Sequence, residues 1–68
     1  QKERFLVNGK YIIVRDAEIF RQRDRQVVRM DILARERLSR DDLNDFKEKI
    51  QDNFSRKLVI RANIIYIL

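Results

Sequence analysis

Between residues 39 and 55 the apolar side chains follow the period of a helix. Four of them recur at intervals of three, four and four positions: Leu43, Phe46, Ile50 and Phe54. This spacing puts them on one side of a helix and leaves the other side polar. Ser39 stands where an N-cap is expected, and Asp42 is placed to complete a capping box with it. The pattern predicts one amphipathic helix over residues 40–55.

The segments on both sides of this helix alternate at period two, which is typical of strands. Residues 57–68 and 26–35 each place their apolar side chains on alternate positions, and residues 11–20 form a third candidate strand. The polar run at 21–25 predicts the turn of a hairpin between the last two. Asn8-Gly9 is a strong turn dipeptide and leaves open a short first strand at 4–7.

These elements predict an α+β fold, a small two-layer sandwich in which one amphipathic helix covers a three- or four-stranded sheet. The predicted order of elements is ββαβ, or βαβ preceded by an extra strand. In the second form strands 26–35 and 58–68 flank a crossover helix and run parallel. Residues 1–68 make one domain, which we expect to be a piece of a longer protein because the chain lacks an initiator Met. The predicted core residues are Val28, Met30, Ile32, Leu43, Phe46, Ile50, Ile60 and Ile64.

The composition argues against an enzyme. The chain has no histidine and no cysteine, which removes the commonest general base, the thiol nucleophile and the usual zinc ligands. Gly9 alone cannot build a phosphate-binding loop, and Ser39 and Ser55 are explained by the two ends of the helix. The acids at 41, 42 and 45 complement the helix dipole rather than matching a calcium-binding pattern. We expect no catalysis, no metal and no cofactor.

The charge is strongly basic. Sixteen basic residues, eleven of them arginines, stand against eleven acidic ones, for a net charge of +5 and a pI near 10.1. Such a balance suits nucleic acid or an anionic membrane surface, or is simply a mixed solvated surface. Four arginines cluster around the predicted hairpin tip, beside Phe20: Arg21, Arg23, Arg25 and Arg29. They make a nucleic-acid-binding module the alternative function.

The last strand favours a different function, association with protein. Residues 64–68 are almost entirely apolar, and the sheet face opposite the helix has no second layer to cover it. An exposed strand of this kind pairs with other chains unless it lies in the middle of its sheet. The residues predicted to make contact are Arg61, Ile65 and Ile67. The expected partner is a second copy of the chain or another part of its own parent protein.

Four segments resemble one bacterial family: KYIIV (10–14), VVRMDIL (27–33), LSRDDL (38–43) and FSRKLVIRA (54–62). Together they are similar to the soluble C-terminal region of the polytopic membrane proteins that carry the uncharacterised hydrophobic domain, domain of unknown function 389, and cyanobacterial members look closest. The resemblance covers residues 10–64, and the apolar end at 64–68 departs from it. It implies a domain on the cytoplasmic side of the membrane, with the membrane spans upstream. It transfers no catalytic or ligand residue, and it gives the arginines a second explanation, attraction to anionic lipid.

Overall fold

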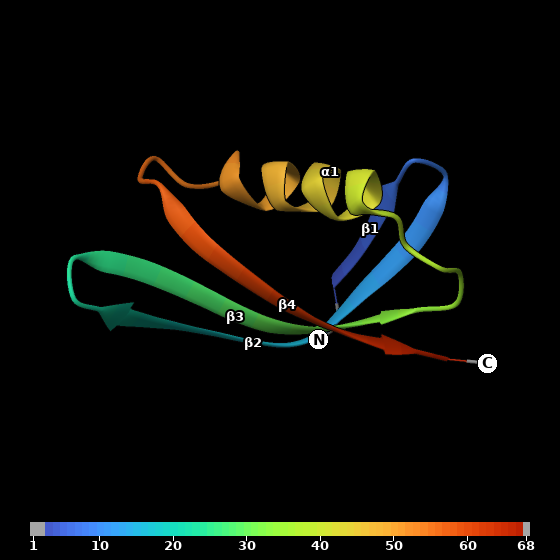
Figure 1. Cartoon of the computed structure of the whole chain (residues 1–68), viewed down its shortest axis with the longest axis horizontal. Coiled ribbons are helices and arrows are strands. Elements are labelled where there is room, and N and C mark those ends of the chain that lie inside the picture. The colour runs from blue at the N-terminus through green and yellow to red at the C-terminus, as the bar shows by residue number, and fades with distance from the viewer. Residues whose placement is uncertain (1–2, 68) are drawn as a thin grey trace.

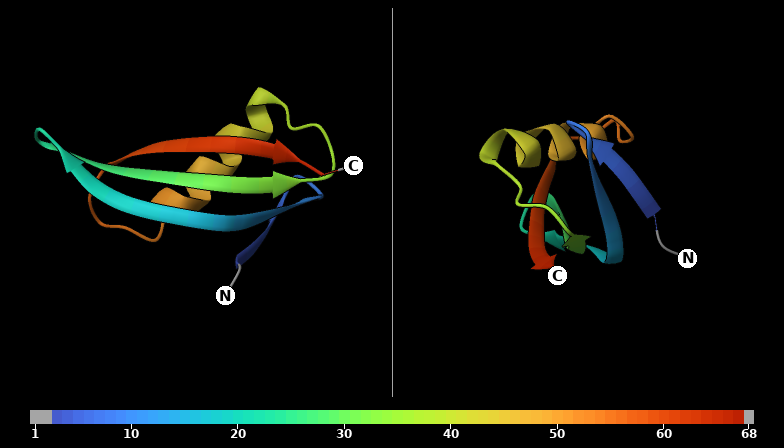
Figure 2. Two further views of the ribbon diagram at one scale, coloured as in Figure 1. Left: turned by 90° about the horizontal axis from the view of Figure 1, so that it is seen from below. Right: turned by 90° about the vertical axis from the view of Figure 1, so that its right-hand side faces the viewer.

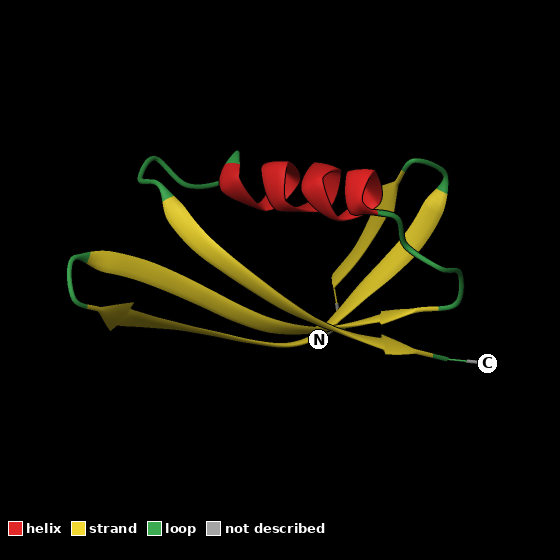
Figure 3. Cartoon of the chain, viewed as in Figure 1, coloured by secondary structure: helices red, strands yellow, loops and turns green. Residues whose placement is uncertain are grey.

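A computed structural model describes residues 3–67 of the chain. It contains four strands and one helix in the order β1 (Glu3–Val7), β2 (Lys10–Gln22), β3 (Arg25–Ala34), α1 (Arg40–Gln51) and β4 (Leu58–Tyr66) (Figures 1 and 3). The predicted α+β class and the single helix are confirmed. The first strand, left open by the sequence, is present, so the order is βββαβ.

The four strands form one sheet in the order β1-β2-β3-β4. β1, β2 and β3 make an antiparallel meander, whereas β4 lies parallel to β3, with Gln26 opposite Leu58 and Ala34 opposite Tyr66. The parallel pairing follows from the crossover through α1, which is the second of the two arrangements that the sequence left open. β4 therefore lies at an edge of the sheet, not in its middle.

Both hairpins turn through two residues in which positive φ angles occur. Asn8 and Gly9 have φ of 49° and 79°, the backbone that the Asn-Gly dipeptide favours between antiparallel strands. The second turn is Arg23-Asp24, where Arg23 has φ 56°. The predicted turn at 21–25 is thus too wide: its other residues belong to β2 and β3, because the register continues to the pair of Gln22 and Arg25.

α1 begins where predicted and ends four residues early. At its start the Ser39 hydroxyl accepts from the Asp42 amide at 3.1 Å, and the Asp42 carboxylate accepts from the Ser39 amide at 2.8 Å. At its end the chain tightens into shorter-range bonds, such as that from the Phe54 amide to the Gln51 carbonyl at 2.9 Å. The Gln51 side chain then accepts from the Leu58 amide at 2.9 Å, which directs the chain into β4. Phe54 consequently leaves the apolar stripe and is 40% exposed.

The core lies between α1 and one face of the sheet, called here the helix face. Among the predicted core residues Val28, Met30, Ile32, Phe46 and Ile50 are buried, and Leu43, Ile60 and Ile64 are half-buried against them. The core also includes residues that the sequence analysis did not select: Val7, Ile12, Ala34, Leu38 and Leu58. Phe5 joins it from β1, with its ring edge-on to Phe46 at 5.4 Å between centroids.

The molecule has two layers, with α1 on the helix face and nothing from residues 3–67 covering the opposite face, called here the open face (Figure 2). β2 and β3 form a long hairpin, called here the hairpin arm, whose tip at residues 21–25 extends past the end of α1 (Figure 1). β1 pairs only with residues 10–14 of β2, up to a bulge at Arg15, so the outer edge of β2 is free from that point on. The elongated dimensions, 37 × 21 × 19 Å, reflect this arm.

Candidate interaction surface

The open face carries an apolar patch at the end where β1 and β2 meet. Its members come from all four strands and the residue after β4: Leu6, Tyr11, Ile13, Leu33, Ile65 and Ile67. Leu6 and Tyr11 are 53% and 59% exposed, and the other four are half-buried. A hollow of about 340 Å³ lies among several of them, with Arg4 and Glu36 on its rim. The predicted contact residues Ile65 and Ile67 both belong to this open-face patch.

Arg4 extends over this patch rather than away from it. Its guanidinium carbon lies 5.6 Å from the centre of the Tyr11 ring, within the range of a cation–π contact. The patch is therefore an apolar surface with a cation held at its border. Aromatic and arginine side chains are both enriched where proteins contact one another.

The middle of the open face is polar and largely satisfied within the chain. Arg29 of β3 pairs with Glu18 of β2. The Asp31 carboxylate accepts from Arg15 Nη2 at 3.5 Å and from the Asn63 amide nitrogen at 3.2 Å. These contacts stabilise the exposed surface without a second layer, although exposed ion pairs of this kind contribute little individually.

Arg61 is the exception in this polar region. Its register partner on β3 is Arg29, so two like charges lie on neighbouring strands. Arg29 has Glu18, but none of the ion pairs among the described side chains, those of residues 4–67, includes Arg61. Its exposed guanidinium is free to bind an acceptor from outside the chain.

The arginine cluster predicted at the hairpin tip is separated by the fold. Arg21, Arg23 and Arg25 are exposed at the tip, and a shallow hollow of about 240 Å³ lies beside the last two. Phe20 is 37% exposed next to them. Arg29 does not belong to the tip: it lies four register pairs away, in the polar region of the open face. The polar run at 21–25 predicts a five-residue turn, whereas the turn has two residues, so the longer strands place the tip away from Arg29.

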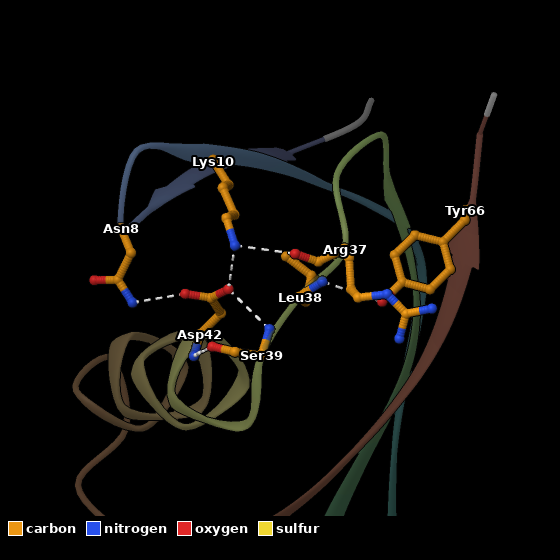
Figure 4. Close-up of polar contacts among 7 residues, drawn as sticks. All are labelled: Asn8, Lys10, Arg37, Leu38, Ser39, Asp42 and Tyr66. Carbon is orange, nitrogen blue, oxygen red and sulfur yellow. Dashed lines mark hydrogen bonds and ion pairs between the residues drawn. The ribbon is translucent and has the colours of Figure 1, made fainter.

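A polar cluster fixes the start of α1 to the β1–β2 turn (Figure 4). Asp42, whose side chain is 5% exposed, accepts from Lys10 Nζ at 2.7 Å and from the Asn8 amide nitrogen at 2.8 Å. Lys10 also donates to the Arg37 carbonyl at 3.0 Å, and the Leu38 amide donates to the Tyr66 hydroxyl at 3.2 Å. The cluster thus joins the β1–β2 turn, the loop before α1 and the end of β4.

The charges of this cluster stabilise one another. The hydrogen bond from Lys10, together with those from Asn8 and the Ser39 amide, holds the pKa of the Asp42 carboxyl well below its ordinary value of 3.8. The same bond raises the pKa of Lys10 above 10.5. Every buried side-chain nitrogen and oxygen of residues 4–67 has a partner, so the cluster leaves no group aimed at a ligand. Its role is structural.

Residues 4–67 contain no group of three or more acidic side chains placed to hold a metal ion. Their one helix, of twelve residues, is not long and apolar enough to cross a membrane.

Comparisons with family models, curated proteins and solved structures found no match to this chain. The resemblance to the hydrophobic-domain membrane proteins therefore stays a prediction.

Proposed function

We propose that this chain is a non-catalytic interaction domain that assembles its parent protein by self-association. The observation that supports this most is the position of β4. β4 is the most apolar strand of the sheet and lies at its edge. It carries Arg61 and Ile65 on the open face. A strand at an edge presents unpaired amides and carbonyls along its outer side. On β4 the Gln51 side chain accepts from the first of these amides, that of Leu58.

The small size of the domain supports the same function. A chain of 68 residues has material for one core, and α1 uses it on the helix face. The open-face patch then gains burial only from a partner. Small domains with a thin core are commonly completed by oligomerisation.

The test is the mass of the chain in solution as a function of concentration, measured by sedimentation equilibrium. We expect a mass above that of one chain, and a shift toward the single chain for Ile65→Lys, which places a charge in the open-face patch. Ile19→Lys is the matched control, because Ile19 is 52% exposed on the helix face of β2, away from β4. Thermal unfolding by circular dichroism checks that both variants fold.

A single-chain mass at the highest concentration contradicts the proposal. So does an Ile19→Lys variant that dissociates as far as Ile65→Lys.

The resemblance adds a location to this proposal. The parent is then an integral membrane protein, and the domain lies on the cytoplasmic side, where exposed arginines are attracted to anionic lipid. Fractionation of the full-length parent tests this: it should sediment with membranes and stay there after a high-salt wash. A parent that remains in the supernatant contradicts the location and leaves self-association in place.

The hairpin arm supports a second candidate, binding of single-stranded nucleic acid. Arg21, Arg23 and Arg25 project at its tip, none of them in an ion pair of residues 4–67, and Phe20 offers a face for stacking. An oligonucleotide titration should then show affinity that falls steeply with added salt. An Arg21→Ala/Arg23→Ala/Arg25→Ala variant with unchanged affinity contradicts it.

A further inference from the structure

The order of apolar and polar residues along β4 is nearly the same whether the strand is followed forward or backward. It is Leu-Val-Ile-Arg-Ala-Asn-Ile-Ile-Tyr, so three apolar residues and one polar residue lie on each side of Ala62. When two copies of one strand pair antiparallel, the two residue numbers of every opposite pair add up to the same total. Two copies of β4 related by a two-fold axis at Ala62 therefore place like chemistry opposite like chemistry.

This register matches side chains on both faces of the sheet. On the helix face Ile60 of one copy lies opposite Ile64 of the other, and Leu58 opposite Tyr66. On the open face Val59 lies opposite Ile65. Apolar cross-strand pairs of this kind stabilise a sheet.

The polar pair of this register also fits the contacts within one chain. Arg61, which lacks an acid among residues 4–67, lies opposite Asn63 of the second copy. Asn63 uses its amide nitrogen to donate to Asp31, and no hydrogen bond of residues 4–67 engages its amide oxygen. The Arg61 guanidinium can donate to that oxygen, and the two-fold axis repeats the contact.

Neighbouring registers are worse for a simple electrostatic reason. An axis at Arg61 places two Arg61 guanidinium groups against each other, which is destabilising. An axis at Asn63 places Arg61 opposite Ile65 and leaves it without an acceptor. The alternation of faces excludes the intermediate registers, which would exchange the helix face with the open face.

The opposite edge, formed by β1 and then by β2 beyond its bulge, lacks this symmetry. An axis at Phe5, the middle of β1, sets Arg4 opposite Leu6. From Asp16 to Gln22, β2 continues beyond the bulge at Arg15 and carries its two acids in the first half and Arg21 in the second. An axis at its midpoint, Ile19, sets Glu18 opposite Phe20 and Ala17 opposite Arg21. The self-complementary edge is β4.

We propose that two copies of this chain pair antiparallel through β4 about a two-fold axis at Ala62, joining their sheets into one of eight strands. The inference rests on the proposed function and adds the partner and the register. An axis perpendicular to the sheet places both helices on the same side and joins the two open faces into one surface. The contact is isologous, as in most homodimers.

The experiment uses the absence of native cysteine, which makes any introduced thiol the only one in the chain. Cα atoms of opposite residues in antiparallel strands lie about 4.5–5.5 Å apart, within the range that a disulfide spans. Ala62→Cys should therefore form a disulfide with itself under mild oxidation and give a covalent dimer. Ala17→Cys is the matched control: also an alanine on the helix face, but at the free edge of β2. It should stay a monomer on a non-reducing gel.

A mixture of Arg61→Cys and Asn63→Cys chains tests the register. The mixed disulfide should dominate over either homodimer, and mass spectrometry separates the three products. All these variants change small or exposed residues, and circular dichroism checks their fold.

The outcomes separate the two proposals. A chain that associates while Ala62→Cys and Ala17→Cys cross-link equally, or not at all, overturns the β4 pairing and leaves self-association standing. Homodimers that dominate in the mixture overturn the register. A single-chain mass at all concentrations overturns both proposals.

Discussion

The two faces of the sheet are built from alternate residues of the same strands, yet they behave as different kinds of surface. On β3, Met30 and Ile32 are at most 4% exposed beneath α1. Their neighbours Arg29 and Asp31 are on the open face, where Glu18 and Asn63 bind them. One helix can cover one face only, so hydrophobic burial stabilises the first face and polar contacts stabilise the second. The apolar residues at the ends of the open face are then available to a partner.

The largest difference should come from two phenylalanines, one inside the core and one outside it. Phe46 is completely buried on the helix, and removal of its ring in Phe46→Ala should lower the free energy of unfolding by about 3–5 kcal/mol. A domain this small has little more stability than that. Phe54→Ala is the control, because Phe54 lies outside the core and is 40% exposed. Equal losses in urea unfolding would show that the core is placed wrongly.

Val27 is an exception to the difference between the two faces, because it is an open-face residue with no exposed surface. It lies between Phe20 and Val59 on the neighbouring strands. Val27→Ala removes two methyl groups and should cost about 1.5 kcal/mol, at roughly 0.8 kcal/mol for each. Val59→Ala, at a half-buried edge position, should cost less in the same unfolding measurement. Equal costs would mean that the open face has no core of its own.

The cluster at the start of α1 should show in the pH dependence of stability. The folded pKa of Asp42 is lowered, so its contribution is complete above its ordinary pKa of 3.8 and is lost as the pH falls below that value. Wild-type stability should therefore fall more steeply than that of Asp42→Asn between about pH 5 and pH 2. The raised pKa of Lys10 matters at alkaline pH. The contribution of Lys10 to stability is complete below its ordinary pKa of 10.5 and is lost as the pH rises through the raised value.

Asp41→Asn provides the control for this profile. Asp41 is the exposed neighbour of Asp42 and contacts neither Lys10 nor Asn8. Its variant should keep the wild-type dependence in urea unfolding at each pH. A wild-type slope in Asp42→Asn would instead assign the acid sensitivity to other carboxylates.

The smallest effect is expected at the tip of the hairpin arm. Arg23 is exposed and its side chain contacts no acid among residues 4–67, so Arg23→Ala should change stability by no more than about 0.5 kcal/mol. Its φ of 56° gives a companion test, because Arg23→Gly removes the cost of a left-handed residue. A large loss in Arg23→Ala would mean that the tip packs against the body of the protein.

Local sequence patterns predicted an element well where its own residues determine its conformation. Ser39 and Asp42 mark the start of α1 within the chain itself, and the alternation on β4 fixes its two faces. The end of α1 depended on Gln51 binding the Leu58 amide, a contact with the next element that no helical period contains. The burial of Val27 similarly depends on two neighbouring strands, so alternation alone placed it on the polar side.

The candidate surface was predicted in part for the same reason. Arg61, Ile65 and Ile67 share the open face because of the period of one strand. Leu6 of β1 joins the patch through its pairing with Tyr11 of β2, and the sequence left that first strand open. The self-complementarity of β4 could have been read from nine letters, but it mattered only after the sheet order placed this strand at an edge.

The parallel pairing of β3 with β4 also orders the events of folding. The β2–β3 hairpin closes through two residues, whereas β4 must return from residue 58 to residue 26 after α1 has formed. Contacts between distant residues form late and slow the reaction, so β4 is the last strand expected to add to the sheet. Its amides should also exchange first with solvent deuterium in the isolated chain. The strand that completes the sheet would then be secured only when a second chain covers its edge.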